Sequence, residues 1–242
     1  MKNGLLIRVA VDSNSDGWNA PCRTNGRFCY VPIGDPNRSD RGSYFDHSYD
    51  EFRPFVTALG GALPPHLSGN CHLDPDFAHL TYGDWKSRGE RIREFLCPGS
   101  FIVFWAGLRW LDGKQAGQIV CSIIGFFRVA HILNASSVGP LHYHCNAHTR
   151  YTASDDHTVV FADPSDSGRL KKHIPIGEHR VDAQRIRQEY LDAWGNLRRR
   201  NGELLKDGYI QLSGNPPIFN DPERFEQWFY RKRPEFVHAN NV

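Results

Sequence analysis

Two long apolar stretches decide the fold: FIVFWAGL at residues 101–108 and QIVCSIIGFFRV at residues 118–129. Each is apolar on both of the faces that alternate along a β-strand, which is typical of strands buried inside a sheet. The polar turn Asp112-Gly113-Lys114 lies between them and can reverse the chain. We therefore predict a central β-hairpin with the other elements arranged around it.

Further elements are expected on both sides of this hairpin. Alternating apolar residues predict a strand at residues 5–12, and a β-branched run predicts another at 158–162, with which we expect the sheet to end. A short basic helix is expected at 84–96. Farther on, apolar spacing predicts an amphipathic helix at 182–206, and Asp221-Pro222-Glu223 predicts the start of a second helix that runs to residue 230.

The predicted fold class is α+β, with a mixed, partly barrel-like sheet and C-terminal helices. We expect a single domain over residues 1–242, with 180–242 as a C-terminal helical extension, because no flexible linker precedes these helices. Residues 34–80 are rich in Gly, Pro, Asp, His and aromatic residues, with one expected helix at 49–59. Such a stretch inside a compact domain is typical of a loop that covers or builds a site.

Composition narrows the class of protein. The 29 Lys and Arg residues nearly balance the 27 Asp and Glu residues, so a nucleic-acid partner has to be held locally rather than by a global field. The six cysteines include no CxxC pair, which favours reduced thiols and a cytoplasmic location. Arg8 interrupts the first apolar stretch, so we expect neither a signal peptide nor a membrane span. Nothing in the sequence indicates an oligomeric state.

The run HYHCNAHTR, which starts at residue 142, is the strongest candidate for a site. Interpreted as a strand, it places these residues on one face: His142, His144, Asn146, His148 and Arg150. A row of proton carriers and donors with a fixed cation fits a pocket or polar groove, and a polar face open to water is the alternative. We assign His148 as general base or base-edge partner, Asn146 as donor and acceptor to a nucleobase, and Arg150 as a phosphate ligand.

A second candidate is the stretch His72-Leu73-Asp74-Pro75-Asp76, with Asp84 farther along. Imidazole and carboxylate groups in a loop can bind a divalent ion or act as acid and base. The alternative is structural, with Asp74 starting a turn and Asp76 capping the next segment.

A zinc site built from His142, His144, Cys145 and His148 is disfavoured. A strand would point Cys145 away from the histidines, and no second ligand pair has the spacing of a structural zinc site. We therefore assign no metal ligands, and the cofactor stays unknown.

Arg8 and Asp12 share one face of the first predicted strand. Together they can hold an anionic group and a hydroxyl or metal, or they can form a half-buried ion pair. Among the aromatic residues, Trp18 and Tyr82 are candidates for stacking on a base, and Trp18 is preferred because its polar loop offers no evident core role.

The loop at residues 165–169 contains two serines, a glycine and an arginine. Its backbone N–H groups, with Ser167 and Arg169, can cradle a phosphate. An ordinary surface turn is the alternative.

Eight short stretches form an ordered set that spans most of residues 5–176: 8–12, 30–33, 72–77, 80–84, 99–109, 123–127, 146–148 and 167–170. This set resembles the third of the nucleotide-modification-associated domain families, found near DNA base-hypermodification systems. The resemblance implies a link to modified nucleotides or nucleic acid, DNA rather than RNA, without defining a reaction. The 101–129 hairpin is also similar to the barrel hairpin of PUA-like, EVE and ASCH domains, which bind modified bases or RNA.

These observations predict a nucleotide or nucleic-acid base modification protein in which His148 moves the proton and Asp74 or Asp12 assists. The expected nucleotide-binding residues are Arg8, Trp18, Tyr82, Asn146, Arg150, Ser167 and Arg169. The alternatives are a non-catalytic reader of a modified base that uses the same pocket, and a small-molecule hydrolase. The sequence has no GxGxxG, Walker-type, GxSxG or HExxH pattern, which disfavours the mechanisms that these motifs support.

Overall fold

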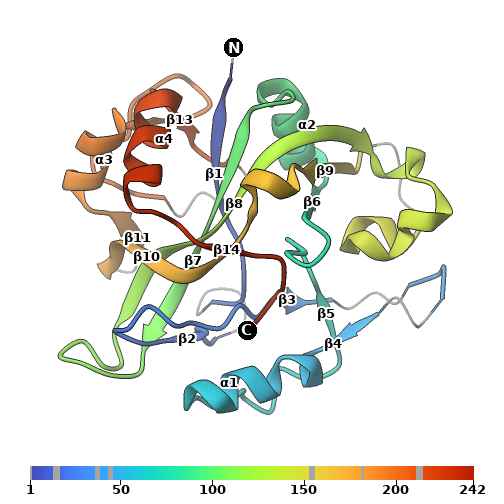
Figure 1. Ribbon diagram of the computed structural model, residues 1–242, viewed down its shortest axis with the longest axis horizontal. Coiled ribbons are helices and arrows are strands. Elements are labelled where there is room, and N and C mark those ends of the chain that lie inside the picture. Colours follow the sequence, from blue (N-terminus) through green and yellow to red (C-terminus); the bar gives the residue numbers. More distant parts are fainter. Residues whose placement is uncertain are drawn as a thin grey trace.

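The central hairpin is confirmed by the computed structural model, which describes residues 2–12, 17–35, 39–42, 46–152, 156–180, 183–210 and 215–242. Strand β7 (Phe101–Trp110) pairs antiparallel with the 16-residue strand β8 (Ile119–Asn134). The first half of β8 also pairs with β10 (Gly168–Arg180), and its second half pairs with β9 (Thr158–Ala162). Strand β8 therefore joins the central sheet to an extension at one end (Figure 1).

The main sheet is mixed and open. Its strand order is β11-β10-β8-β7-β1-β13-β12, and β1 and β2 run parallel to β7 while the other pairs are antiparallel. The remaining strands of this sheet are β1 (Gly4–Arg8), β2 (Pro21–Cys22), β6 (Thr81–Asp84), β11 (Ala183–Ile186), β12 (Leu197–Arg198), β13 (Ile218–Phe219) and β14 (Phe236–Val237). The α+β class with C-terminal helices is confirmed, and over the described residues the sheet does not close into a barrel.

Two C-terminal helices cover one face of the sheet. They are α3 (Gln188–Trp194) and α4 (Pro222–Arg231), and they pack on a core that includes Phe101, Phe126, Trp194 and Phe225. Helix α4 begins as predicted, because Asp221 accepts a hydrogen bond from the backbone of the first turn and proline follows it. Each large apolar side chain buried here contributes about 1.5–3 kcal/mol.

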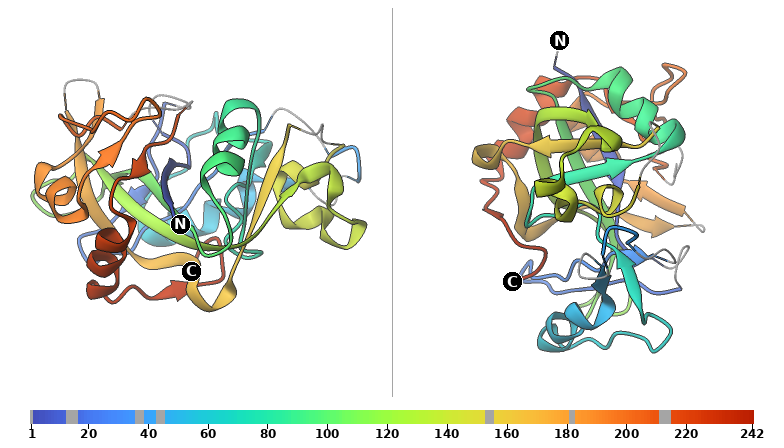
Figure 2. Two further views of the ribbon diagram at one scale, coloured as in Figure 1. Left: turned by 90° about the horizontal axis from the view of Figure 1, so that it is seen from above. Right: turned by 90° about the vertical axis from the view of Figure 1, so that its right-hand side faces the viewer.

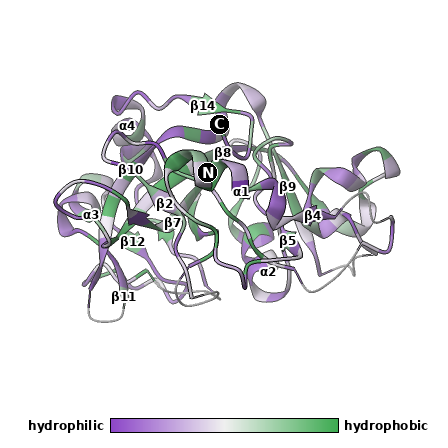
Figure 3. Ribbon diagram, turned by 90° about the horizontal axis from the view of Figure 1, so that it is seen from below, coloured by the Kyte–Doolittle hydropathy of each residue, from purple (hydrophilic) through white to green (hydrophobic). Residues whose placement is uncertain are grey.

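The opposite face of β7 and β8 carries the larger core. Around it lie α1 (Arg53–Leu59) with the 3₁₀ turn η2 (Tyr49–Glu51), and α2 (Lys86–Phe95), which confirm the helices predicted at 49–59 and 84–96. A small separate sheet has the order β3-β5-β4, formed by β3 (Ile33–Gly34), β5 (Asn70–His72) and β4 (His47–Ser48). Apolar residues gather on the central strands and polar ones on the outer helices and loops (Figure 3).

The segment with the histidine run is not a strand. It forms two 3₁₀ helices, η4 (Pro140–Cys145) and η5 (Ala147–Thr149), at the end of the molecule away from α3 and α4 (Figures 1 and 2). Two further 3₁₀ turns are η3 (Ala135–Ser137) and η6 (Pro164–Asp166). Pro140 starts η4, and the Asn146 side chain accepts the His148 N–H, so local capping bonds replace a strand ladder. The common face predicted for the run is therefore wrong.

The C-terminal third also differs from the prediction. The sheet does not end at β9, because β10 continues it for 13 residues along β8. The helix predicted at 182–206 is limited to α3, with β11 and β12 on either side. Gly195 ends this helix with a left-handed φ of 72°, a conformation that glycine adopts without a steric penalty. Residues 180–242 are therefore only partly helical.

Candidate functional site

Three side chains from two segments distant in the sequence converge at the sheet extension. His72 ends β5, Asp74 follows two residues later, and His148 lies in η5. The Nε2 atoms of the two histidines are 3.3 Å apart, and Oδ2 of Asp74 is 3.7 Å from Nε2 of His148. One ligand atom from each residue lies within 4.8 Å of the others. We call these three residues the His72 cluster.

The orientation of His72 is set by Asp35. Pairing of β5 with β3 places Ile33 opposite His72, so Asp35 follows close by. Its Oδ2 lies 3.1 Å from Nδ1 of His72. A carboxylate can only accept here, so Nδ1 carries the hydrogen and the lone pair of the neutral ring is on Nε2, which faces His148.

His148 is held from its other side by His157. Their Nδ1 atoms are 2.8 Å apart, and the Tyr151 hydroxyl is 3.5 Å from Nδ1 of His148. Burial, aided by the nearby charges of His72 and His157, holds the pKa of His148 well below its ordinary value. The ring is therefore neutral at physiological pH and can donate a lone pair to a proton or a cation.

Asp74 is a buried carboxylate, with only 5% of its side chain exposed. Its Oδ1 accepts hydrogen bonds from the Gly83 N–H at 2.9 Å and from the Asn146 amide at 2.8 Å. Burial raises the pKa of Asp74 to about 7, although both hydrogen bonds oppose the shift. The Asn146 side chain also accepts from the His148 N–H, so one amide aligns two members of the cluster.

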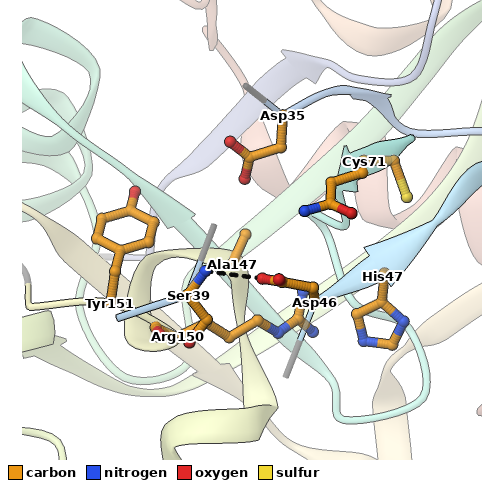
Figure 4. A pocket seen from close by; sticks show the side chains of 9 residues that line it. Asp35, Ser39, Asp46, His47, Cys71, Ala147, Arg150 and Tyr151 are labelled. Carbon is orange, nitrogen blue, oxygen red and sulfur yellow. Dashed lines mark hydrogen bonds between the residues drawn. The ribbon is translucent and has the colours of Figure 1, made fainter. Parts of the chain in front are cut away.

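A small pocket, with room for about one water molecule, opens beside the cluster, and Figure 4 shows the side chains that line it. Its lining residues are Asp35, Ser39, Asp46, His47, Asn70, Cys71, Ala147, Arg150 and Tyr151. Asp35 and Tyr151 belong both to this wall and to the contacts of His72 and His148. The cluster and the cavity are therefore neighbouring parts of one site.

Asp76 organises a second buried network next to the first. It binds the guanidinium of Arg150 at 3.2 Å, Nδ1 of His79 at 2.8 Å and the Asn240 amide at 3.1 Å. Burial alone would raise its pKa, but these partners outweigh burial and lower it. Asp76 also accepts from the Ala78 N–H, which confirms the capping role left open as its alternative. This carboxylate is occupied by structural partners.

The model of the nucleotide modification associated domain 3 family matches residues 3–203. The chain belongs to this family. The match includes every residue of the His72 cluster and its contacts with Asp35 and His157. No curated protein and no solved structure shows significant similarity to this member of the family. None of the helices in the described ranges combines the length and apolarity needed to cross a bilayer.

In this family member, Arg8 and Asp12 form the ion pair that the sequence left open as an alternative. Only 4% of the Asp12 side chain is exposed. The positive charge of Arg88 contributes to lowering the pKa of both Arg8 and His148, although burial is the larger cause in each case. The ion pair and the His72 cluster are therefore within electrostatic range of the same cation.

Tyr82 is an interior residue. Its hydroxyl donates to Asp84 at 2.5 Å and accepts from Arg88 at 2.9 Å, and its ring packs edge-on against Phe104. Only 1% of Tyr82 is exposed. In this structure the ring has no open face for a base.

The structure gives other partners to the remaining residues that we expected to bind a nucleotide. Trp18 is half-buried against the larger core. Ser167 accepts the Arg128 backbone N–H at 2.9 Å. Arg169 donates to the Phe28 carbonyl at 2.6 Å and stacks on the Phe28 ring. Ser167 and Arg169 are therefore buried and engaged within the fold, and base stacking by Trp18 stays a prediction.

Cys145 does not point away from the histidines as a strand would require. Its Sγ lies 3.8 Å from Nδ1 of His142 and 3.6 Å from Nε2 of His144. His148 belongs to the His72 cluster, whereas His142 and His144 lie beside Cys145, so the four residues considered for zinc do not form one site.

Sequence reasoning missed Asp35 and His157, the two residues that hold the imidazoles. Asp35 lies 37 positions from His72, and His157 is nine positions from His148. No motif links these positions. Only the pairing of β3 with β5 and the return of the chain into β9 bring them to the site.

Proposed function

We propose that this protein chemically modifies a nucleotide or nucleobase, and that His72, Asp74 and His148 supply the reacting groups. Membership of the family supports the connection to nucleotide modification. The observation that carries the proposal is the convergence of two imidazole Nε2 atoms and one buried carboxylate beside a cavity. Groups that converge in this way are typical of catalytic sites, and burial shifts the pKa of both Asp74 and His148.

The cavity wall favours a base rather than a chain of phosphates. It contains two carboxylates, Asp35 and Asp46, the Asn70 amide and the Tyr151 ring. Carboxylates accept hydrogen bonds from the exocyclic amino groups of bases and repel phosphates. Arg150 also lines the pocket, and its Nε has no hydrogen-bond partner among the described residues, so this atom is a candidate donor to the substrate.

A base in DNA would have to leave the stack, as it does in other base-modifying enzymes, and this small pocket would have to widen to receive it. We propose a DNA base as substrate, with Arg150 as the retained nucleotide-site residue, while the buried Asn146 amide positions Asp74 and His148. We also propose a cytoplasmic location, which is supported by six free cysteines, five of them buried.

The test compares nucleosides from total DNA of host cells that express the wild-type chain or His148→Gln. Host cells supply the co-substrates of the reaction, whose identity would have to be known in advance for an assay with purified protein. Liquid chromatography and mass spectrometry should detect a modified nucleoside with the wild type and lose it with His148→Gln. His142→Gln is the matched control, since it changes an exposed histidine of the same segment.

Binding of a single-stranded oligonucleotide by both purified proteins completes the test. The proposal expects affinities within about threefold of each other, because a reacting group contributes mainly in the transition state. An unchanged modified nucleoside with His148→Gln would contradict the catalytic role. Tight binding without any modification by the wild type would instead indicate a reader.

A further inference from the structure

We infer that His72, Asp74 and His148 bind a divalent transition-metal ion through Nε2, Oδ2 and Nε2, with further coordination positions open. The inference concerns the same site as the proposed function and gives that site a cofactor. It rests on the ligand geometry, and its test does not require turnover.

The distance between the two imidazoles matches that expected between two ligands of one ion. Two imidazole nitrogens at about 2.0–2.1 Å from a tetrahedral zinc are about 3.3 Å from each other. The Nε2 atoms of His72 and His148 are 3.3 Å apart. Oδ2 of Asp74 is 3.7 Å from Nε2 of His148, and all three ligand atoms lie within 4.8 Å of one another, so the carboxylate has to move by up to about 1.5 Å to join both imidazoles on one ion.

The hydrogen-bond partners direct lone pairs toward the same point. Asp35 accepts from Nδ1 of His72, which leaves the Nε2 lone pair facing His148. On His148, Nδ1 is engaged with His157, so its Nε2 also faces the cluster. A carboxylate or a second polar group behind each liganding imidazole is the usual arrangement around protein-bound metals.

The surroundings of Asp74 also favour a bound cation at this site. The partners of Asp74 at hydrogen-bonding distance are the neutral Gly83 N–H and the neutral Asn146 amide. The side chains of Asp74 and His148 are each only 5% exposed, and a buried carboxylate requires a compensating partner. A divalent ion bound between them stabilises the carboxylate and uses the neutral form of both rings.

The ligand types select the class of metal. Two imidazoles and one carboxylate suit zinc, iron, cobalt, nickel or manganese, whereas magnesium and calcium prefer oxygen ligands. Three protein ligands are typical of catalytic sites, in which the open position takes water or substrate. The structural sites that zinc uses in small domains have four protein ligands instead.

The test measures metal binding by the whole chain after chelator treatment and dialysis. Calorimetric titration with Zn²⁺ or Co²⁺ should show one ion per chain, and Mg²⁺ should show no binding at the same concentration. His72→Gln and His148→Gln should each weaken Zn²⁺ binding by at least about 100-fold, more than the loss expected for a residue behind a ligand. Asp74→Asn, which keeps the side-chain shape, should weaken it as well.

The controls are His142→Gln and His144→Gln, whose rings lie near Cys145. They should keep wild-type affinity, and circular dichroism should show that every variant is folded. Absence of stoichiometric binding of Zn²⁺, Co²⁺, Fe²⁺ and Mn²⁺ by the wild type would overturn the inference. The inference would also be overturned if folded His72→Gln kept wild-type Zn²⁺ affinity, or if only the two control variants lost it.

The two proposals fail separately. If the wild type binds no metal but the modified nucleoside still depends on His148, the metal site is wrong and acid–base chemistry remains. If one metal ion binds through the three residues but neither modification nor oligonucleotide binding occurs, the metal site is correct and the nucleotide function is wrong.

Discussion

Gly83 lies directly against the imidazole of His148. A Cβ atom at Gly83 would stand 2.4 Å from Cδ2 of His148 and 2.6 Å from Oδ1 of Asn146. The Gly83 N–H also donates to Asp74. Strand β6 therefore positions two members of the His72 cluster through one residue that has no side chain.

Gly83→Ala should displace His148 and weaken Zn²⁺ binding by at least about tenfold, because buried atoms at such distances have to move. Calorimetric titration measures this loss. Gly139→Ala is the matched control, since no atom of the residues that the structure describes lies within 4 Å of its added Cβ and its φ is −74°. Equal affinity in both variants would show that the contact does not position His148.

Asp35→Asn should lower metal affinity by about 10- to 100-fold, the range found for partners behind a ligand. The amide removes the charge that favours hydrogen on Nδ1 of His72. Asp46→Asn removes another carboxylate from the same cavity and should leave affinity nearly unchanged. Similar losses in the two variants would point to general electrostatics rather than to the orientation of His72.

His173 should make folding stability depend on pH. It is 5% exposed, Nδ1 lies 2.9 Å from the Ser122 hydroxyl, and burial lowers its pKa from 6.5 to about 4. The unfolded chain therefore binds a proton at higher pH than the folded chain does. The contribution of neutral His173 to the free energy of unfolding is complete above pH 6.5. It is lost as pH falls toward 4, by up to about 3 kcal/mol.

Urea unfolding of the wild type and His173→Asn between pH 7 and pH 4 measures this contribution. The variant should lose less stability over that interval, whatever its stability at pH 7. His142→Gln, which changes an exposed ring, is the control. Parallel pH profiles for wild type and His173→Asn would exclude His173 as a source of the dependence.

Arg91→Met should stabilise the fold. Arg91 is fully buried in α2, and within the described part of the chain none of its three side-chain nitrogens has a hydrogen-bond partner, although the guanidinium lies 3.9 Å from the centre of the Phe95 ring. An unsatisfied buried donor costs about 1–3 kcal/mol, more if charged, so methionine should raise the urea midpoint. Arg93→Met removes an exposed arginine of the same helix that donates to Thr158, and should not raise it.

Local signals predicted those elements whose formation depends on neighbouring residues. The apolar runs of β7 and β8 predict a buried hairpin, and Asp221 with Pro222 predicts the start of α4. The histidine run shows the limit of this approach. Alternation favoured a strand there, but the Asn146 capping bonds formed a 3₁₀ turn instead.

By itself, the sequence determined the central hairpin, the α+β class and the family, because these follow from apolar periodicity, capping residues and ordered motifs. Only the tertiary structure decided the site. His72 and His148 are 76 positions apart, and their meeting depends on the pairing of β5 with β3 and of β6 with β9. Strand pairing is set by how distant surfaces bury one another, and no local spacing encodes it.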